Sequence, residues 1–126
     1  MKPFRRDYQF TPHFHFAELT TTSHPVDNRP TSLEHMLNLM KLAHVLEHFR
    51  KFSGPLLINS AFRTPELNRL VKGHPNSFHM LGLAADVRSN KYTSVRLLEL
   101  FRNHSHPLYK IEFQLYPTFV HLEIVS

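Results

Sequence analysis

The segment between Pro30 and Gly54 holds the longest regular pattern in the chain, and it constrains the fold more than any other segment. Thr31-Ser32-Leu33-Glu34 is typical of a capping box at the start of a helix, and Gly54 is typical of a helix end. Between them, apolar side chains recur at helical spacing: Leu33, Met36, Leu37, Met40, Ala43, Leu46 and Phe49. We therefore predict one long helix over residues 31–53 that buries this stripe in the core.

Four short apolar runs predict strands at residues 56–60, 83–87, 110–116 and 119–125. The last two runs alternate between apolar and polar residues and are separated by Pro117-Thr118. We interpret them as an antiparallel hairpin in which Tyr116 pairs with Phe119. Because side chains alternate across a strand, this pairing places four polar side chains on one face: Glu112, Gln114, His121 and Glu123.

Two shorter helices complete the pattern. Thr64-Pro65 predicts a capped helix start, with the helix over residues 67–72 and an end at Gly73. A second helix over residues 93–102 is expected to bury Val95, Leu97, Leu98 and Phe101. Helices and strands mix without the regular strand–helix–strand units of a parallel sheet. We predict an α+β fold, a small antiparallel sheet with flanking helices, formed as a single domain over residues 1–126. The first thirty residues read as loop, with residues 1–13 as an extended arm.

The 126-residue chain has no cysteine, so a transition-metal site would need histidine and carboxylate ligands. Its net charge of +5 favours an anionic partner such as nucleic acid, phospholipid or the anionic cell wall. Lys and Arg are scattered singly rather than gathered into a stripe, so nucleic acid is not an expected partner. The basic start MKPFRRDYQF has no apolar run behind it, and no stretch reaches the length of a membrane span. We expect neither a signal peptide nor a membrane-spanning segment.

A candidate metal site comes from residues far apart in the sequence. His79 and Asp86 flank a turn that contains Gly82, and His121 lies in a separate predicted strand. A catalytic zinc ion takes three protein ligands from imidazole nitrogen and carboxylate oxygen and keeps a fourth position open. Gly82 permits a sharp turn, and Ala84-Ala85 allows close packing beside a metal. The same residues at this spacing also fit ordinary core or surface roles, so spacing alone leaves both interpretations open.

The pattern Ser-x-His-x-x-Gly-x-Ala-x-Asp over residues 77–86 resembles the signature of the zinc D-Ala-D-Ala carboxypeptidase and endolysin superfamily, whose architecture hedgehog amino-terminal domains share. Three further segments agree with it. Residues 59–63 resemble the Ser-Gly-Tyr-Arg strand end of that family, and residues 68–73 resemble its Asn-to-Gly helix. Residues 16–20 resemble the entry segment of its compact, often phage-encoded branch. The resemblance thus extends from about residue 14 to the end of the chain.

Carried over to the matching positions, the resemblance implies that His79, Asp86 and His121 bind Zn2+. It implies that Arg63 binds the substrate and polarises its carbonyl or terminal carboxylate, a task suited to a guanidinium group. Ser77 either hydrogen-bonds the substrate or braces the loop that presents His79.

The resemblance also implies a function. A member of this family would be a zinc metallopeptidase that hydrolyses peptidoglycan stem peptides, either as a D-Ala-D-Ala carboxypeptidase or as an endolysin-like endopeptidase. Such an enzyme would be made in the cytoplasm and act at the bacterial cell wall or in the periplasm. The small size and basic charge suit a virus-encoded lysis enzyme, and we expect a monomer.

One position departs from the family pattern. The usual general base, an acidic residue three positions before the last histidine, is replaced by Thr118, which cannot accept a proton from water at neutral pH. Glu123 and Glu112 share a predicted face with His121, and either could act as the base. Both could instead face solvent or support the imidazole as hydrogen-bond partners. The alternative function is therefore a zinc-containing, catalytically impaired module that binds peptides or cell wall.

Overall fold

The computed structural model describes residues 8–126, so the basic start of the chain and the first part of the predicted arm lie outside the described residues. In chain order the elements are β1 (Gln9–Thr11), β2 (Phe14–His15), α1 (Phe16–Leu19), α2 (Leu33–Ser53), β3 (Leu57–Ser60), α3 (Pro65–Leu70), the 3-10 helix η1 (Phe78–Leu81), β4 (Ala84–Arg88), α4 (Ser94–Arg102), β5 (Ile111–Leu115) and β6 (Val120–Ile124). The mixture of helices with small antiparallel sheets confirms the predicted α+β class.

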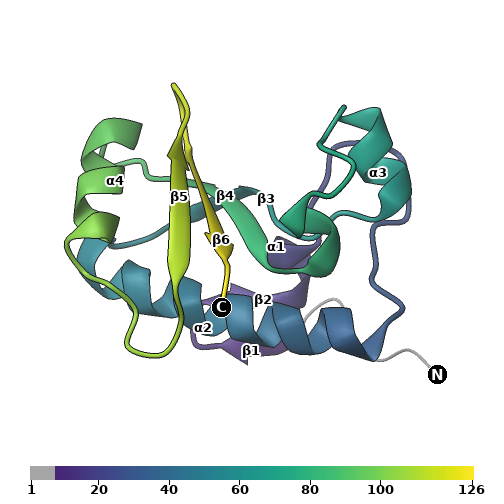
Figure 1. The fold of residues 1–126 in the computed structure, drawn as a ribbon, viewed down its shortest axis with the longest axis horizontal. Coiled ribbons are helices and arrows are strands. Elements are labelled where there is room, and N and C mark those ends of the chain that lie inside the picture. The colour runs from purple at the N-terminus through teal and green to yellow at the C-terminus, as the bar shows by residue number, and fades with distance from the viewer. Residues whose placement is uncertain (1–7) are drawn as a thin grey trace.

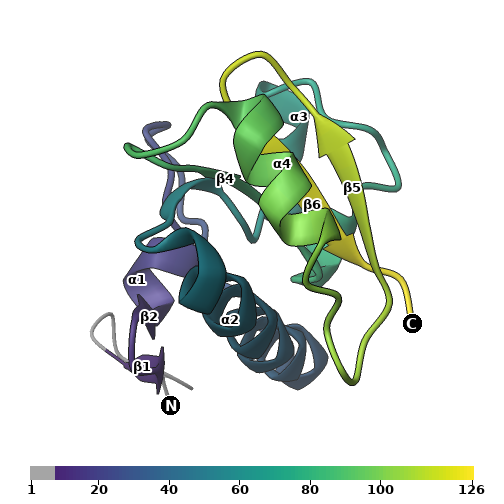
Figure 2. The same cartoon turned by 90° about the vertical axis from the view of Figure 1, so that its left-hand side faces the viewer.

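Within the described residues, the main sheet has the strand order β3-β4-β6-β5, and each neighbouring pair is antiparallel. The long helix α2 lies below this sheet, while α4 and α3 stand near its opposite ends (Figure 1 and Figure 2). The β5–β6 hairpin has the predicted register, because the Tyr116 amide donates to the Phe119 carbonyl at 3.0 Å and Gln114 pairs with His121. In the observed strand order β5 is an edge strand and β6 an inner strand.

The core is built mainly on one face of α2, but the predicted stripe on that helix is partly wrong. Leu33 and Leu37 are 73% and 54% exposed. The residues of α2 that are buried include Met36, Leu39, Leu42, Ala43, Val45, Leu46 and Phe49. The prediction had the correct helical period but placed the buried face at the wrong angle around the axis of α2. Apolar residues cover more than one face of this helix, so the period alone does not select the buried one. Val95 is a second such error: it is 54% exposed in the first turn of α4, whereas Leu97, Leu98 and Phe101 are buried.

The caps of the helices follow the sequence closely, with one correction. Ser32, not Thr31, is the N-cap of α2, and its hydroxyl accepts the His35 amide at 3.4 Å. The capping box predicted with Glu34 is therefore absent from this described helix start. Thr64 caps α3 with Pro65 in its first turn, as predicted, but α3 spans Pro65–Leu70 and ends before the predicted Gly73. Thr93, the predicted first residue of the next helix, is the N-cap of α4.

The N-terminal segment is more ordered than predicted. Strands β1 and β2 pair with each other, α1 follows directly, and β1 and β2 contact α2. Phe14, Phe16 and Leu19 are buried by this packing. Residues 9–11 of the predicted arm therefore form part of the packed fold. Among residues 8–126, no helix is both long and apolar enough to cross a membrane.

One ion pair fixes the β1–β2 turn on α2. The His13 amide donates to Glu47 Oε1 at 2.9 Å, and His13 Nδ1 lies 2.8 Å from Glu47 Oε2. Burial raises the pKa of Glu47, but the hydrogen bonds from His13 outweigh this effect and hold that pKa below its ordinary value.

Replacing Glu47 by glutamine is expected to lower the free energy of unfolding by about 1 kcal/mol near neutral pH. Because the pKa of Glu47 is lower in the folded than in the unfolded protein, its stabilisation is present above the unfolded value near 4.5 and is lost as pH falls through the folded value. Urea unfolding of both proteins over a pH series measures this difference. A difference that stays constant down to acidic pH contradicts the assignment.

Candidate metal centre

His79 is held by a rigid turn that packs against α2. Ser77 caps η1 by accepting the His79 amide at 3.1 Å, and Gly82 ends it with a left-handed φ of 79°. A Cβ at Gly82 would lie 3.0 Å from the His35 carbonyl oxygen, so a side chain there would crowd α2. The His79 ring is buried, with the residue 3% exposed. The hydrogen bond of Ser77 is the bracing contact considered from the sequence, and a contact to substrate stays a prediction.

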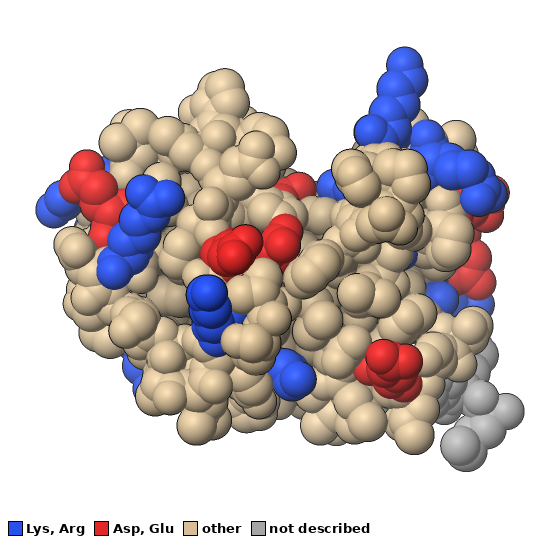
Figure 3. Space-filling model, in the orientation of Figure 1, with Lys and Arg blue, Asp and Glu red and all other residues tan. Residues whose placement is uncertain are grey.

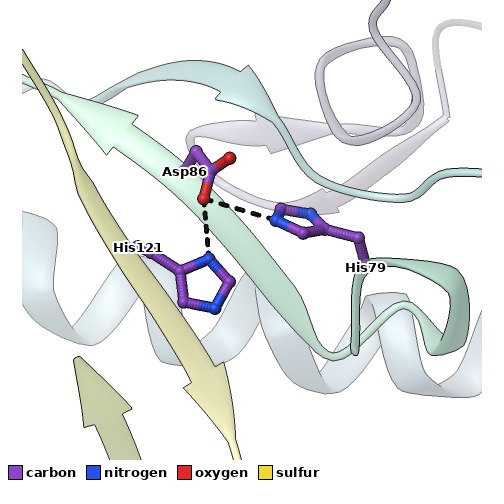
Figure 4. Close-up of side chains that lie close together, drawn as sticks. All are labelled: His79, Asp86 and His121. Atoms are coloured by element: carbon purple, nitrogen blue, oxygen red, sulfur yellow. Dashed lines mark hydrogen bonds and ion pairs between the residues drawn. The ribbon is translucent and has the colours of Figure 1, made fainter. Parts of the chain in front are cut away.

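Asp86 and His121 are brought together by the sheet. They are direct partners in the β4–β6 register, and the neighbouring Ala84 and Ala85 are fully buried. Asp86 Oδ1 lies 2.8 Å from His121 Nδ1 and 3.3 Å from His79 Nε2 (Figure 4). One possible ligand atom from each residue lies within 4.8 Å of the others. These three residues could therefore hold a metal ion.

The hydrogen bonds around the two rings fit this interpretation. His79 donates its Nδ1–H to the Ala61 carbonyl oxygen at 2.6 Å, so a neutral ring turns the lone pair of Nε2 toward Asp86. His121 Nε2 lies 2.7 Å from Glu123 Oε1, and a neutral ring bonded in this way turns the lone pair of Nδ1 toward Asp86. Two lone pairs and a carboxylate oxygen then face one point. Such a donor set requires a cation, and it matches the nitrogen and oxygen ligands that zinc prefers.

The pKa shifts of Asp86 and His121 also indicate that positive charge is stabilised at this point. Burial raises the pKa of the Asp86 carboxyl, but hydrogen bonds from His121 and His79 outweigh burial and hold it well below its usual range. Burial lowers the pKa of His121, but its bonds to Asp86 and Glu123 raise it overall. A divalent ion would satisfy these groups in place of the protons.

A family model described as Peptidase M15 matches residues 12–123 of the chain. The chain belongs to the peptidase M15 family. This is the family of zinc peptidases of the D-Ala-D-Ala carboxypeptidase type, which confirms the resemblance inferred from residues 77–86. No curated protein matches the chain.

In this M15 chain, Arg63 lies behind Asp86 and braces it. Its Nη2 is 3.5 Å from Asp86 Oδ2, its Nε donates to Ser60 Oγ at 3.1 Å, and its Nη1 donates to Asn68 Oδ1 at 3.3 Å. Among the described residues, these bonds use three of the five N–H groups that a guanidinium carries. Two donors remain for a substrate oxygen, and that role of Arg63 stays a prediction.

A buried asparagine holds Arg63 in turn. Asn68 is 3% exposed, and its Nδ2 donates to the His74 carbonyl oxygen at 2.9 Å. A Cβ at Gly73 would collide with Asn68 Oδ1 and lie 2.9 Å from Arg63 Nη1, so only glycine fits between them. The family resemblance included the segment from Asn68 to Gly73 but gave it no physical role. In the structure, this segment anchors the guanidinium group of Arg63.

The candidate metal centre of this M15 protein opens into a cleft of about 620 Å³. His79, Asp86 and His121 line it together with Arg63 and Ser77. In the space-filling view the surface is hollowed between the tip of the β5–β6 hairpin and the region of α3, with acidic atoms at the bottom of the hollow (Figure 3).

The two candidate bases lie in different surroundings. Glu123 lines the cleft, whereas Glu112 is exposed and lines a separate cavity beside Phe49 and Phe101. They are direct partners across the hairpin, as predicted, but Glu112 lies on the edge strand β5 and Glu123 on the inner strand β6. Thr118 is exposed in the hairpin turn and is not among the described residues that line the cleft.

Sequence reasoning missed two aromatic residues of the M15 cleft. Tyr116 and Phe119 line it, and their rings stack at 4.6 Å between centroids. The signal was present, because the alternation that placed Gln114 and His121 on one face extends to Tyr116 and Phe119. The predicted face named only its polar members and left out these two aromatic residues.

Proposed function

We propose that this protein is a zinc metallopeptidase that hydrolyses peptidoglycan stem peptides, with His79, Asp86 and His121 as its zinc ligands. The observation that carries the proposal is the convergence of these three side chains on one point of an open cleft. Membership of the M15 family supports both the metal and the reaction class.

The chemistry of the site divides between the ion and the chain. A bound zinc ion supplies a Lewis acid that polarises a peptide carbonyl and makes water acidic enough to lose a proton near neutral pH. Arg63 holds Asp86 in its orientation and offers its remaining N–H groups to the substrate. Glu123 hydrogen-bonds to His121 through Oε1, which fixes the ring, and we assign to its carboxylate the removal of a proton from the attacking water. The same carboxylate then returns the proton to the leaving amine.

The substrate class rests on the family and on charge. M15 peptidases are of the D-Ala-D-Ala carboxypeptidase type, and the net charge of +5 favours attraction to the anionic cell wall. We infer that the protein acts at the bacterial cell wall, where it trims terminal D-Ala or cuts within the stem peptide. The wall-lysing role of a phage enzyme belongs to the second of these possibilities.

A second candidate function is a zinc-containing module that binds wall peptides without cutting them. Thr118 favours it, because the usual position of the general base carries no carboxylate. The position of Glu123 in the cleft favours the enzyme over the module.

Digestion of purified muropeptides by the zinc-loaded protein, followed by mass spectrometry, separates these functions. Release of free D-Ala identifies a carboxypeptidase, and new stem-peptide fragments identify an endopeptidase. Chelator-treated protein and the Asp86→Ala variant serve as inactive controls. Zinc-loaded protein that binds muropeptides and releases neither product is the module, and the proposal of an enzyme is then wrong.

A further inference from the structure

The tip of the β5–β6 hairpin presents a tyrosine to the cleft. The Tyr116 amide donates to the Phe119 carbonyl at 3.0 Å, which closes the hairpin. The next pair along the same face is Gln114 and His121, so Tyr116 is a diagonal neighbour of His121. Aromatic side chains reach their diagonal neighbours across an antiparallel pair. Tyr116, His121 and Asp86 accordingly line one cleft.

The Tyr116 ring is fixed by its stack on Phe119. The two ring planes lie within 8° of parallel, with centroids 4.6 Å apart. Tyr116 is 36% exposed, and within residues 8–126 its hydroxyl group makes no hydrogen bond to the protein. A donor whose ring is held in place and whose hydroxyl is not engaged is suited to a ligand that enters the cleft.

Arg63 lies near this phenol but is more withdrawn. The side chain of Arg63 is only 14% exposed, and three of its N–H groups are bonded to Ser60, Asn68 and Asp86. Arg63 and Tyr116 both line the cleft that holds His79, Asp86 and His121. The pair therefore brings a largely buried cation and an accessible hydroxyl donor to the same cleft.

We propose that Tyr116 is a catalytic residue whose hydroxyl hydrogen-bonds the oxygen of the scissile carbonyl as negative charge develops on it. This inference rests on the proposed peptidase function. When the water oxygen bonds to the carbonyl carbon, the electron pair of the C=O π bond moves onto the carbonyl oxygen. The phenol donates its O–H hydrogen bond to that oxygen, stabilises the charge and keeps its own proton. One such pre-positioned donor typically contributes about 100-fold to 1,000-fold in kcat.

The Tyr116→Phe variant isolates this hydroxyl. Phenylalanine keeps the ring that stacks on Phe119, so thermal stability and zinc content should stay at wild-type levels. We expect kcat on muropeptides to fall by about 100-fold, with KM changed by less than about threefold, because the lost bond forms only as charge develops. Tyr109→Phe is the matched control, since Tyr109 lines a separate cavity and its variant should keep full activity.

A second readout does not depend on turnover. A phosphinate analogue of D-Ala-D-Ala carries the tetrahedral, charged oxygens that the hydroxyl would meet. Tyr116→Phe should bind this phosphinate about 100-fold more weakly than wild type and bind the uncleaved peptide equally well. Equal phosphinate affinity, or kcat within about threefold of wild type, overturns the assignment of Tyr116. If the wild type releases no product but the phosphinate affinity still falls, the proposed function fails while the contact made by Tyr116 stands.

Discussion

Replacing His79 by alanine should remove the proposed zinc binding and peptidase activity together. His79 supplies one of three convergent donor atoms, and its ring is buried and oriented by the Ala61 carbonyl. Loss of a hydrogen-bond partner behind a ligand already costs about 10-fold to 100-fold in metal affinity, so loss of the ligand itself should cost more than about 100-fold. Zinc titration by calorimetry and metal analysis after gel filtration measure this loss.

His44 provides the matched control. It is an exposed histidine on α2, so His44→Ala removes an imidazole without touching the metal centre. It should bind one zinc with wild-type affinity. His121→Ala should also lose zinc binding, although His121 lies on β6 rather than on η1. Loss in both variants separates removal of a ligand from local unfolding of η1. If His79→Ala keeps one zinc at wild-type affinity, the proposed ligand set is wrong.

Replacing Glu123 by glutamine should leave zinc bound and lower kcat by at least about 100-fold, the usual contribution of a general base. Glutamine can still accept the hydrogen bond from His121 Nε2, but it cannot take a proton from water. Zinc affinity should therefore fall by no more than about tenfold. Steady-state kinetics on muropeptides and zinc titration of the same preparation give both quantities.

Glu112→Gln is the control for this substitution, because Glu112 pairs with Glu123 in the sheet but lines a separate cavity. It should retain full activity. If Glu112→Gln loses activity and Glu123→Gln keeps it, the base is Glu112. If both variants keep full turnover, no carboxylate of this hairpin acts as the base, and Glu123 serves only to orient His121.

The parts of the fold that sequence predicted well are those with one dominant local signal. The hairpin register followed from strict alternation on both sides of Pro117-Thr118. The start of α3 followed from Thr64, whose hydroxyl accepts a backbone amide at the helix start.

Other parts depend on contacts that local patterns do not contain. The buried face of α2 was misplaced because Leu33 and Leu37 compete with Leu39 and Leu42 for the same period, and only packing against the sheet chooses between them. Strands β1 and β2 are three and two residues long, too short for a periodic signal, and they are ordered by their contacts with α2.

The candidate site also depends on tertiary contacts that local sequence patterns do not contain. Spacing could not decide that His79, Asp86 and His121 meet, because their proximity depends on the pairing of β4 with β6 and on the turn that η1 makes. The family signature supplied that information. The hydrogen bond between Arg63 and Asn68 could not be predicted from the sequence, since it depends on the path of the chain after α3 and on the absence of a side chain at Gly73.

X-ray absorption spectroscopy at the zinc edge, on protein loaded with one equivalent of zinc, tests the central claim most directly. The proposed ligand set requires two imidazole nitrogens at about 2.0–2.1 Å and carboxylate and water oxygens at about 2.0–2.2 Å. In the His79→Ala and His121→Ala variants, this two-imidazole signal should be lost. A wild-type spectrum with fewer than two imidazoles, or with oxygen ligands alone, would contradict a zinc site built from His79, Asp86 and His121.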